Sequence, residues 1–400
     1  MHQPPALNPR ISRLHEYPFE RLARLKQGVT PPAGLKHIAM SIGEPQHPPP
    51  AAILQALAAH QHELDSYPST AGLPALRAAC AAWMTRRFAL GKPIEPDTMV
   101  LPVCGTREGL FSFVQTVVDA RRRPIVVMPN PFYQIYEGAA LLAGAEPYYQ
   151  SEPLEAVPAA VWERCALLFI CTPGNPTGAT MNLEALGLVL ELANRYGFVV
   201  ASDECYAELY QHDSSPPPSI ANACERAGRE RMQGCVAFHS LSKRSSVPGL
   251  RSGFAVGDPA IMKAYLQYRT YHGCALPLPT QHASIVGWND DAAPAGNRAL
   301  YREKFARVLP VLAPLLDVHE PDGAFYLWPH LVGRAGSDDE AFARGLFETQ
   351  NVTVLPGSYL ARETRGSNPG RGHVRISLVP PVADCVTAAE RIATYLRTSV

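Results

Sequence analysis

The stretch SLSKRSSVPGLRSGF, residues 240–254, places a lysine three residues after one serine and directly after another, and an arginine eight residues further on. A solvated run of charge does not need hydroxyl groups beside its lysine. Nor does it need glycines on both sides of its arginine, as Gly249 and Gly253 flank Arg251. Glycine lets a backbone approach a ligand closely. The pattern therefore indicates that Lys243 and Arg251 face one small molecule, and the rest of the chain should supply its other contacts.

The composition indicates a globular protein of two lobes, with 400 residues, 46% hydrophobic and 18% charged. The 36 Lys and Arg residues balance the 36 Asp and Glu residues, which predicts neither a nucleic-acid nor a membrane partner. The N-terminal sequence has no apolar core typical of a signal peptide. The nine cysteines include no C-x-x-C pair, so we expect no metal, no disulfide framework and a cytoplasmic location.

Between residues 98 and 257, short apolar runs alternate with amphipathic segments such as 109–120 and 183–197. Runs that are apolar on both faces and separated by helices predict a mostly parallel sheet covered on both sides, which is an α/β fold. The runs are 98–104, 124–128, 166–171, 198–202, 234–239 and 252–257.

The pattern changes after a long helical region near 280–315. Residues 322–328, 352–357 and 373–379 are then typical of strands in a smaller α+β lobe. We expect a large domain over residues 46–285 and a small domain formed by 1–45 and 286–400.

Polar groups follow the first three runs. Gly105 and Thr106, with Arg107 after them, begin a helix after the first run, which suits a phosphate but also suits an ordinary tight turn. Tyr133 follows the second run, as a ring for stacking or as core packing. Asn175 lies in the turn-rich loop TPGNPTG after the third. Because ligands bind at the carboxyl ends of parallel strands, these groups should lie together.

The next two runs end in an acid and in the lysine. Asp203 directly follows a buried run, where an acid is costly unless a cation meets it, although a helix N-cap is the alternative. Tyr206 lies close by, and Lys243 follows the fifth run. Pyridoxal 5′-phosphate needs this whole set: a lysine for its aldehyde, a carboxylate for its pyridine nitrogen, donors for its phenolic oxygen and a phosphate pocket.

The chain also resembles the class I and II aminotransferases, which are pyridoxal-phosphate enzymes of fold type I. The resemblance covers nearly the whole length and depends on motifs that occur in family order. They are IGEP (42–45), YPSTAGLPALR (67–77), CGTRE (104–108), NPFY (130–133), TPGNPTG (172–178), SDECY (202–206), SLSK (240–243), GLRSG (249–253), DGAFYLW (322–328) and RISL (375–378). It implies a large domain with a seven-stranded, mostly parallel sheet between helices, and a smaller α+β domain.

The resemblance implies a role for each matching residue. Lys243 binds the cofactor covalently and then moves the substrate proton, and Asp203 pairs with the pyridine nitrogen. Tyr206 and Asn175 hold the phenolic oxygen. Tyr133 stacks on the ring, where many relatives have a tryptophan. The phosphate group is surrounded by Gly105, Thr106, Arg107, Ser240, Ser242 and Arg251.

The resemblance implies that Arg375 binds the substrate α-carboxylate, assisted by Gly43 and Asn175. Without the resemblance, the spacing of Arg375 would indicate a surface residue. Tyr67 matches a tyrosine that reaches the neighbouring subunit's phosphate, which implies a homodimer with shared active sites.

The function implied is reversible transfer of an amino group between an amino acid and a 2-oxo acid. YPFERLARL (17–25) and residues 240–254 look most like the N-succinyldiaminopimelate aminotransferases of bacterial lysine biosynthesis. The alternatives are another class I aminotransferase or a β-C–S lyase on the same fold. A regulator that only senses the cofactor would need a DNA-binding domain, for which the short N-terminal segment leaves no room. Arg13, Arg269 and His272 are candidates for the distal carboxylate by residue type and position.

Overall fold

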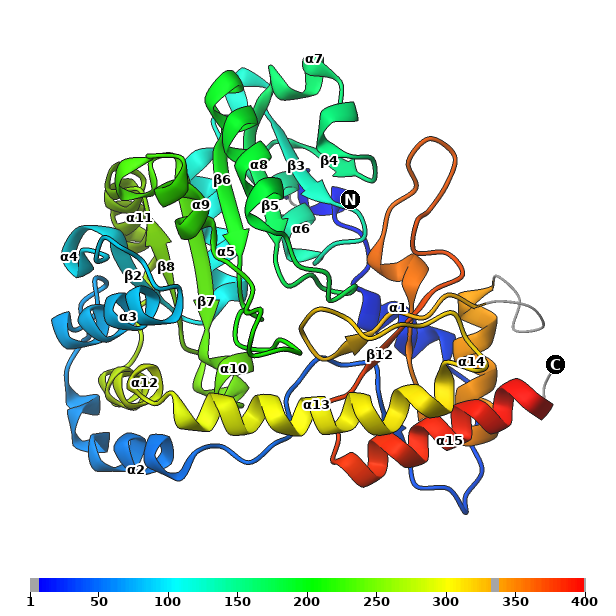
Figure 1. Cartoon of the computed structure of the whole chain (residues 1–400). Coiled ribbons are helices and arrows are strands. Elements are labelled where there is room, and N and C mark those ends of the chain that lie inside the picture. Colours follow the sequence, from blue (N-terminus) through cyan, green and yellow to red (C-terminus); the bar gives the residue numbers. More distant parts are fainter. Residues whose placement is uncertain (1–6, 332–337, 399–400) are drawn as a thin grey trace, which may run out of the picture.

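The computed structural model describes residues 7–331 and 338–398, and its largest feature is a sheet of seven strands (Figure 1). In spatial order the strands are β2 (Val100–Val103), β8 (Gly253–Gly257), β7 (Cys235–Ser240), β6 (Val199–Asp203), β5 (Cys165–Cys171), β3 (Ile125–Pro129) and β4 (Glu146–Gln150). The predicted α/β fold with a mostly parallel sheet is confirmed.

Strand β8 runs antiparallel to both neighbours, β2 and β7. Its first residue, Gly253, therefore pairs with Ser240 at the last residue of β7. This reversal puts Arg251, which precedes β8, at the same edge of the sheet as the residues that follow the parallel strands.

Strand β4 corresponds to none of the six apolar runs. It pairs only with β3, at the sheet margin, and its residues are half-buried or exposed. Its sequence, EPYYQ, therefore carries no continuous apolar signal.

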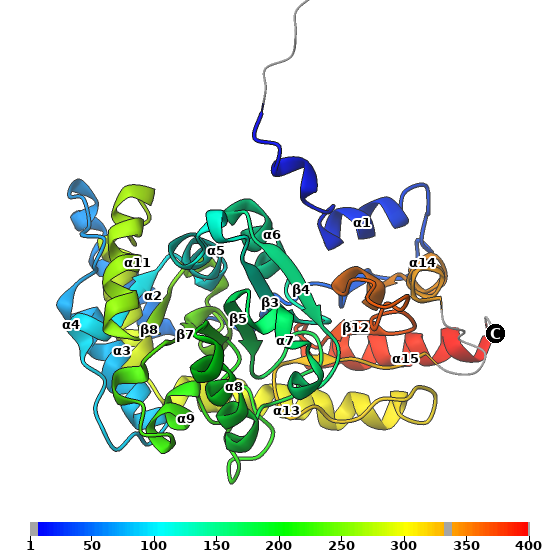
Figure 2. The ribbon, with the colours of Figure 1, turned by 90° about the horizontal axis from the view of Figure 1, so that it is seen from above.

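Alternate residues of the central strands enter two separate hydrophobic cores. In β5, Leu167 and Phe169 pack toward α5, α6 and α11, whereas Leu168 and Ile170 pack toward the helices of the opposite face. Figures 1 and 2 show these two helical layers. The helices of this part of the chain are α2 (Ala51–Ala59), α3 (Pro74–Arg87), α4 (Pro96–Met99), α5 (Thr106–Val117), α6 (Ile135–Ala143), α7 (Ala159–Trp162), α8 (Leu183–Tyr196), α9 (Ile220–Arg226), α10 (Leu241–Arg244), α11 (Pro259–His272) and α12 (Leu278–Asn289).

The smaller lobe contains a three-stranded antiparallel sheet and a parallel strand pair. The strands are β11 (Leu355–Pro356), β12 (Val374–Ser377) and β9 (Tyr326–Leu327) in the sheet, with β1 (Ile38–Ala39) and β10 (Val352–Thr353) as the pair. The helices are α1 (Pro18–Leu25), α13 (Ala292–Leu312), α14 (Asp339–Gln350) and α15 (Val382–Thr398).

Helix α13 connects the two lobes and packs on α15 (Figure 1). The boundary expected near residue 285 lies within α12, whose Trp288 packs on Trp83 of the larger lobe. We therefore propose that the large domain extends to Asn289, where α12 ends. Among the described residues, no helix is long and apolar enough to cross a bilayer.

Candidate active site

A cavity of about 640 Å³ lies where the carboxyl edge of the large sheet meets the smaller lobe. The predicted residues that line it are Gly43, Thr106, Arg107, Tyr133, Asn175, Asp203, Tyr206, Ser240, Ser242, Lys243, Arg251 and Arg375. Gly105 lies beneath the guanidinium of Arg251, because a Cβ there would be 2.3 Å from Arg251 Nη2. Tyr67 is fully exposed and lies outside this cavity.

Lys243 extends into the cavity from the short helix α10, directly after β7. Its Nζ donates a hydrogen bond to the backbone carbonyl of Gly43. Burial lowers the pKa of Lys243 to about 8, because the charged amine loses its hydration. The amine is therefore partly neutral near physiological pH, as a lysine that attacks an aldehyde requires.

Asp203 ends β6 and is almost completely buried. Tyr136 donates a hydrogen bond to Asp203 Oδ2 at 2.6 Å, and the Cys205 backbone N–H donates to Oδ1 at 3.3 Å. Burial raises the pKa of Asp203, and these hydrogen bonds offset part of the rise. The next residues form a turn, so the helix N-cap alternative for Asp203 is wrong. A cation at this end of the cavity would restore the ionised carboxylate.

Hydroxyl and cationic groups line another part of the cavity, which is formed by Thr106, Ser240 and Arg251. Thr106 Oγ1 accepts a hydrogen bond from Cys205 Sγ at 2.9 Å, and Ser240 Oγ accepts one from the Ser242 backbone N–H at 3.1 Å. Gly105 has a φ of 80°, a conformation that favours glycine, and begins helix α5. With Arg251 lying over Gly105, this end offers the donors and the positive charge that a phosphate requires.

Tyr133 lines the cavity and is fixed at its hydroxyl. Arg107 Nε donates to Tyr133 Oη at 2.9 Å, and Arg107 Nη2 donates to Tyr17 Oη at 3.4 Å. Arg107 therefore holds two tyrosines of the cavity wall and still lines the cavity itself.

Arg375, on β12, reaches into the cavity from the smaller lobe and is almost completely buried. Its Nη1 donates to Asn175 Oδ1 at 2.8 Å, and its Nη2 donates to the Ser41 carbonyl at 2.7 Å. Its Nε is buried without a hydrogen-bond partner among the described residues. These neutral partners leave the positive charge uncompensated, which suits a substrate carboxylate.

Several residues of the site were not predicted. Tyr136 orients Asp203, and Tyr326 donates to or accepts from Tyr206 at 2.7 Å between their hydroxyls. Tyr326 also lies under the Arg375 guanidinium, 4.6 Å from it, and against Gly43. Tyr326 belongs to the motif DGAFYLW, which is the one signal in the sequence that could have identified it; Tyr136 has none.

The three candidates for a distal carboxylate do not line this cavity within the described part of the chain. Arg269 is fully buried beside Glu108, with its Nη1 2.5 Å from Glu108 Oε1. His272 lies near the same carboxylate, and Arg13 ends an exposed 3-10 helix. Arg269 is therefore a structural ion-pair residue.

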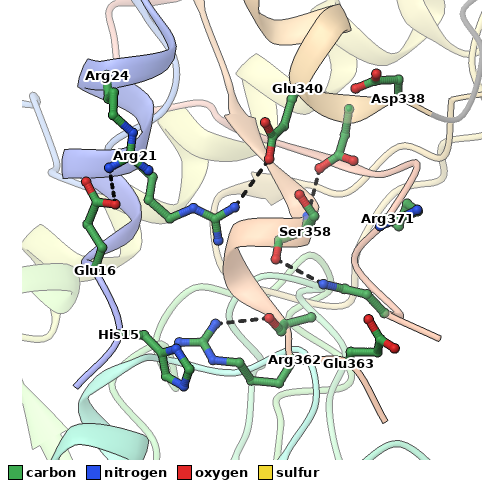
Figure 3. Close-up of a pocket in the computed structure, with 13 residues that line it drawn as sticks. His15, Glu16, Arg21, Arg24, Asp338, Glu340, Ser358, Arg362, Glu363 and Arg371 are labelled. Atoms are coloured by element: carbon green, nitrogen blue, oxygen red, sulfur yellow. Dashed lines mark hydrogen bonds and ion pairs between the residues drawn. The ribbon is translucent and has the colours of Figure 1, made fainter. Parts of the chain in front are cut away.

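A second cavity, of about 830 Å³, lies between α1, α14 and residues 358–371 (Figure 3). Its wall is strongly charged, but most of the charges have partners: Arg21 contacts Glu340 at 3.2 Å, and Arg24 contacts Glu16. Arg362 turns away to Glu137 of α6. Its described lining residues include no lysine, so they do not provide the chemistry assembled around Lys243.

Comparison with known proteins decides the family. Residues 36–392 match the family model described as aminotransferase class I and II. The chain belongs to this family. Like its other members, this aminotransferase is dependent on pyridoxal phosphate and has the fold of type I.

Two solved structures and one curated relative illustrate the range of similarity. An aminotransferase from Neisseria meningitidis is 47% identical, with a TM-score of 0.92 over 98% of this chain and 100% of that one. A probable N-succinyldiaminopimelate aminotransferase from Thermus thermophilus is 27% identical, with a TM-score of 0.82 over 94% and 99%. An LL-diaminopimelate aminotransferase from Desulforudis audaxviator is 32% identical over 96% of both chains.

The residues of the cavity fit pyridoxal phosphate. Lys243 provides a partly neutral amine, Asp203 a buried carboxyl group that forms no ion pair within the described part of the chain, and the Gly105–Arg251 end a cradle without side-chain bulk. The bound cofactor supplies an electron sink for the bond to the substrate Cα. We propose that the protein's part is to orient the substrate carboxylate through Arg375, and to hold the proton that Lys243 would accept and return.

Proposed function

We propose that this aminotransferase acts on an amino acid of the diaminopimelate type in bacterial lysine biosynthesis, with 2-oxoglutarate as acceptor. The observation that carries the proposal is the charge distribution in the cavity. Arg375 offers an uncompensated cation inside it, while Arg107 and Glu44 also line it. A long substrate with one carboxylate on Arg375 would present its distal charges to these two side chains.

N-succinyl-LL-diaminopimelate is the first candidate, supported by the resemblance of residues 17–25 and 240–254 and by the name of the Thermus thermophilus neighbour. Its distal end carries only carboxylates and an amide, which suit the Arg107 guanidinium. Glutamate has the same two-carboxylate chemistry, so one cavity would accept both half-reactions.

Free LL-diaminopimelate is the second candidate, supported by the name of the Desulforudis audaxviator relative. Its distal end carries an ammonium group, which suits Glu44. Glu44 is exposed at the cavity wall and close enough to raise the pKa of Lys243 by its charge.

A single-turnover comparison tests these candidates. The loaded enzyme is mixed with glutamate, with N-succinyl-LL-diaminopimelate or with LL-diaminopimelate, and the absorbance of the lysine-bound cofactor is followed. We expect the free compound to react about 30- to 1000-fold more slowly than the succinylated one, because its distal ammonium would leave the Arg107 guanidinium without a carboxylate partner. A faster reaction with the free compound, slowed selectively by Glu44→Gln, would establish the second candidate instead.

The same assay separates transamination from β-C–S lyase chemistry. An aminotransferase converts the cofactor to its amino form and needs a 2-oxo acid to return it. Continuous release of ammonia and a 2-oxo acid without an acceptor would identify a lyase.

We also propose that the enzyme is a homodimer in which each active site uses Tyr67 of the partner subunit. The support is the complete exposure of Tyr67, together with exposed Leu64 three residues before it. Large apolar side chains that protrude singly into water are ordinary, but an aromatic ring on a protruding loop also suits an interface.

A further inference from the structure

Two histidines face one glutamate where the 3-10 helix η2 (Gln61–Asp65) meets α12. His60 Nδ1 lies 2.6 Å from Glu63 Oε1, and His282 Nε2 lies 3.3 Å from Glu63 Oε2. The two imidazole rings are stacked, with centroids 3.6 Å apart and planes inclined by 5°. One ligand atom from each of the three residues lies within 4.8 Å of the other two.

We propose that His60, Glu63 and His282 bind one divalent cation of the zinc class. Two imidazole nitrogens and one carboxylate oxygen are a donor set that Zn²⁺ accepts, with a fourth position left for water. The three side chains are between a quarter and a third exposed, so an ion can enter and water can complete the site. The site is separate from the cavity around Lys243 and its test does not depend on the proposed substrate.

The ligand atoms are already close, but the two stacked imidazole rings would have to tilt so that both point a nitrogen at one ion. Two ligands at about 2.0–2.1 Å from a tetrahedral ion are about 3.3 Å apart. The His282–Glu63 contact is already 3.3 Å, and the His60–Glu63 contact of 2.6 Å would have to open by rotation of a part-exposed side chain.

The charge around the cluster favours a cation, in contrast to a second group of possible ligands. Glu108, His272 and Cys274 are also close together, but Arg269 lies 2.5 Å from the same Glu108 carboxylate and occupies it. No arginine or lysine forms an ion pair with Glu63 among the described contacts, and Asp65 lies in the same turn. The cysteine pattern could not indicate such a site, because none of its three residues is a cysteine. A local sequence motif could not indicate it either, because Glu63 and His282 are 219 positions apart.

A bound ion would fix the loop that carries Tyr67. This loop follows η2, and at its other end the Leu73 backbone N–H donates to Gln281 Oε1 at 2.6 Å. Gln281 and His282 are neighbours on α12, so the ion and this hydrogen bond would anchor both ends of residues 64–73 to one helix. Occupancy should therefore protect the amides of this loop from hydrogen exchange.

The test uses the full chain with its cofactor, without an affinity tag, in phosphate-free buffer. Zinc is titrated by calorimetry, and the metal retained after gel filtration is quantified. We expect one ion per chain, with affinity at least about tenfold weaker in His60→Ala, His282→Ala and Glu63→Gln, because even outer groups of a metal site have effects of that size. Co²⁺ in the same site should show visible absorption bands but no sulfur-to-metal charge-transfer band. The absence of that band would show that no cysteine binds the ion.

His319→Ala is the matched control. His319 also lies close to a carboxylate, 3.3 Å from Asp317, but this pair contains one histidine where the proposed site contains two. It should retain full zinc binding, and circular dichroism should show that every variant is folded. Absence of retained zinc in the wild-type protein would overturn the proposal. Equal retention by the wild type and by both histidine variants would also overturn it.

Discussion

Two lysines of this chain have pKa values lowered to about 8 by loss of hydration, half-buried Lys243 and fully buried Lys304. Only Lys243 lines the cavity, since Lys304 lies on α13 and donates to the Val379 carbonyl at 3.1 Å. Nucleophilicity alone therefore does not distinguish them, whereas position does. The sequence predicted Lys243 rather than Lys304 because its neighbours, rather than its own chemistry, form the motif, and Lys243 does line the cavity.

We expect borohydride to fix the cofactor to Lys243, with no label on Lys304. Lys243→Ala should bind the cofactor without this linkage and transfer amino groups at least several hundred-fold more slowly, because the proton-transfer base is lost. Lys304→Met should retain full covalent labelling. Peptide mapping by mass spectrometry gives the answer, and a label on any lysine other than Lys243 would refute the assignment.

The pKa of Lys243 also predicts a pH dependence for loading the apoenzyme. The neutral amine is the attacking form, so the attachment rate should rise with pH through about 8 and then level off. An ordinary lysine, with a pKa of about 10.4, would give a rate that continues to rise. Stopped-flow absorbance measures the rate, and a midpoint near the ordinary value would show that burial does not tune this amine.

Asp203 and Tyr136 form a pair whose contributions can be separated. If Asp203 pairs with the pyridine nitrogen, as we propose, Asp203→Asn removes the charge there, and turnover should fall by two or more orders of magnitude, or about 3 kcal/mol. Tyr136→Phe removes a hydrogen bond that lowers the pKa of Asp203. That pKa should rise, so the ionised form is lost at higher pH and the acid limb of the kcat profile moves upward.

A purely structural role for Tyr136 would change stability without moving that limb. Near-normal turnover of Asp203→Asn would show that the carboxylate has no part in the reaction.

At the scale of elements, the sequence predicted six of the seven strands of the large sheet because each is apolar on both faces. It did not predict β4, whose EPYYQ sequence is half-buried at the margin. The strands of the smaller lobe are also shorter than their apolar runs, and β9 has only Tyr326 and Leu327. Short strands of this kind are defined by partners far away in the chain, which a local pattern does not contain.

One buried ion pair joins elements of the two lobes, beside contacts such as those of Arg375 with Asn175 and of Tyr326 with Tyr206. Arg362 donates to Glu137 of α6 through Nε at 2.7 Å and Nη2 at 2.5 Å, and Tyr149 donates to the same carboxylate at 2.6 Å. Removing the arginine would leave a buried carboxylate with only one donor from this set. Arg362→Met should therefore cost about 3 kcal/mol of unfolding free energy.

Urea denaturation of the cofactor-saturated protein measures this effect. Arg365→Met is the matched control on the same loop, since Arg365 is mostly exposed and its pair with Glu152 should be worth less than about 1 kcal/mol. The double variant Arg362→Met/Glu137→Met should recover part of the loss. Equal effects of Arg362→Met and Arg365→Met would show that the buried pair is not what holds the lobes.

At the scale of the whole molecule, the site is assembled from both lobes. Asp203 ends one strand of the large sheet and Lys243 follows another, whereas Arg375 comes from β12 and Gly43 from the segment that connects the lobes. The order of motifs along the sequence identified these residues, but their mutual contacts, such as Arg375 with Asn175, became known only from the structure. Arg107 and Glu44, which we propose for the substrate's distal end, lie in two of these motifs, but the motifs did not indicate that role.

The proposed homodimer gives the last prediction. If each site combines Lys243 of one subunit with Tyr67 of the other, a hybrid of Lys243→Ala and Tyr67→Ala subunits has one site that lacks both residues and one that has both. Mixing and refolding the two inactive homodimers should then restore up to about half of wild-type activity per hybrid, because complementation is all-or-none at each site.

Both variants should fold normally on their own, since Tyr67 is fully exposed within one chain. Its loop lies away from α1 and residues 7–13, which project at another margin of the molecule in Figure 2. The control mixes wild-type subunits with subunits that carry both Lys243→Ala and Tyr67→Ala. Each site of such a hybrid has one substitution, so the hybrids should contribute no activity beyond that of the wild-type homodimers. Activity in a monomer, measured with light scattering at working concentration, would contradict the shared site directly.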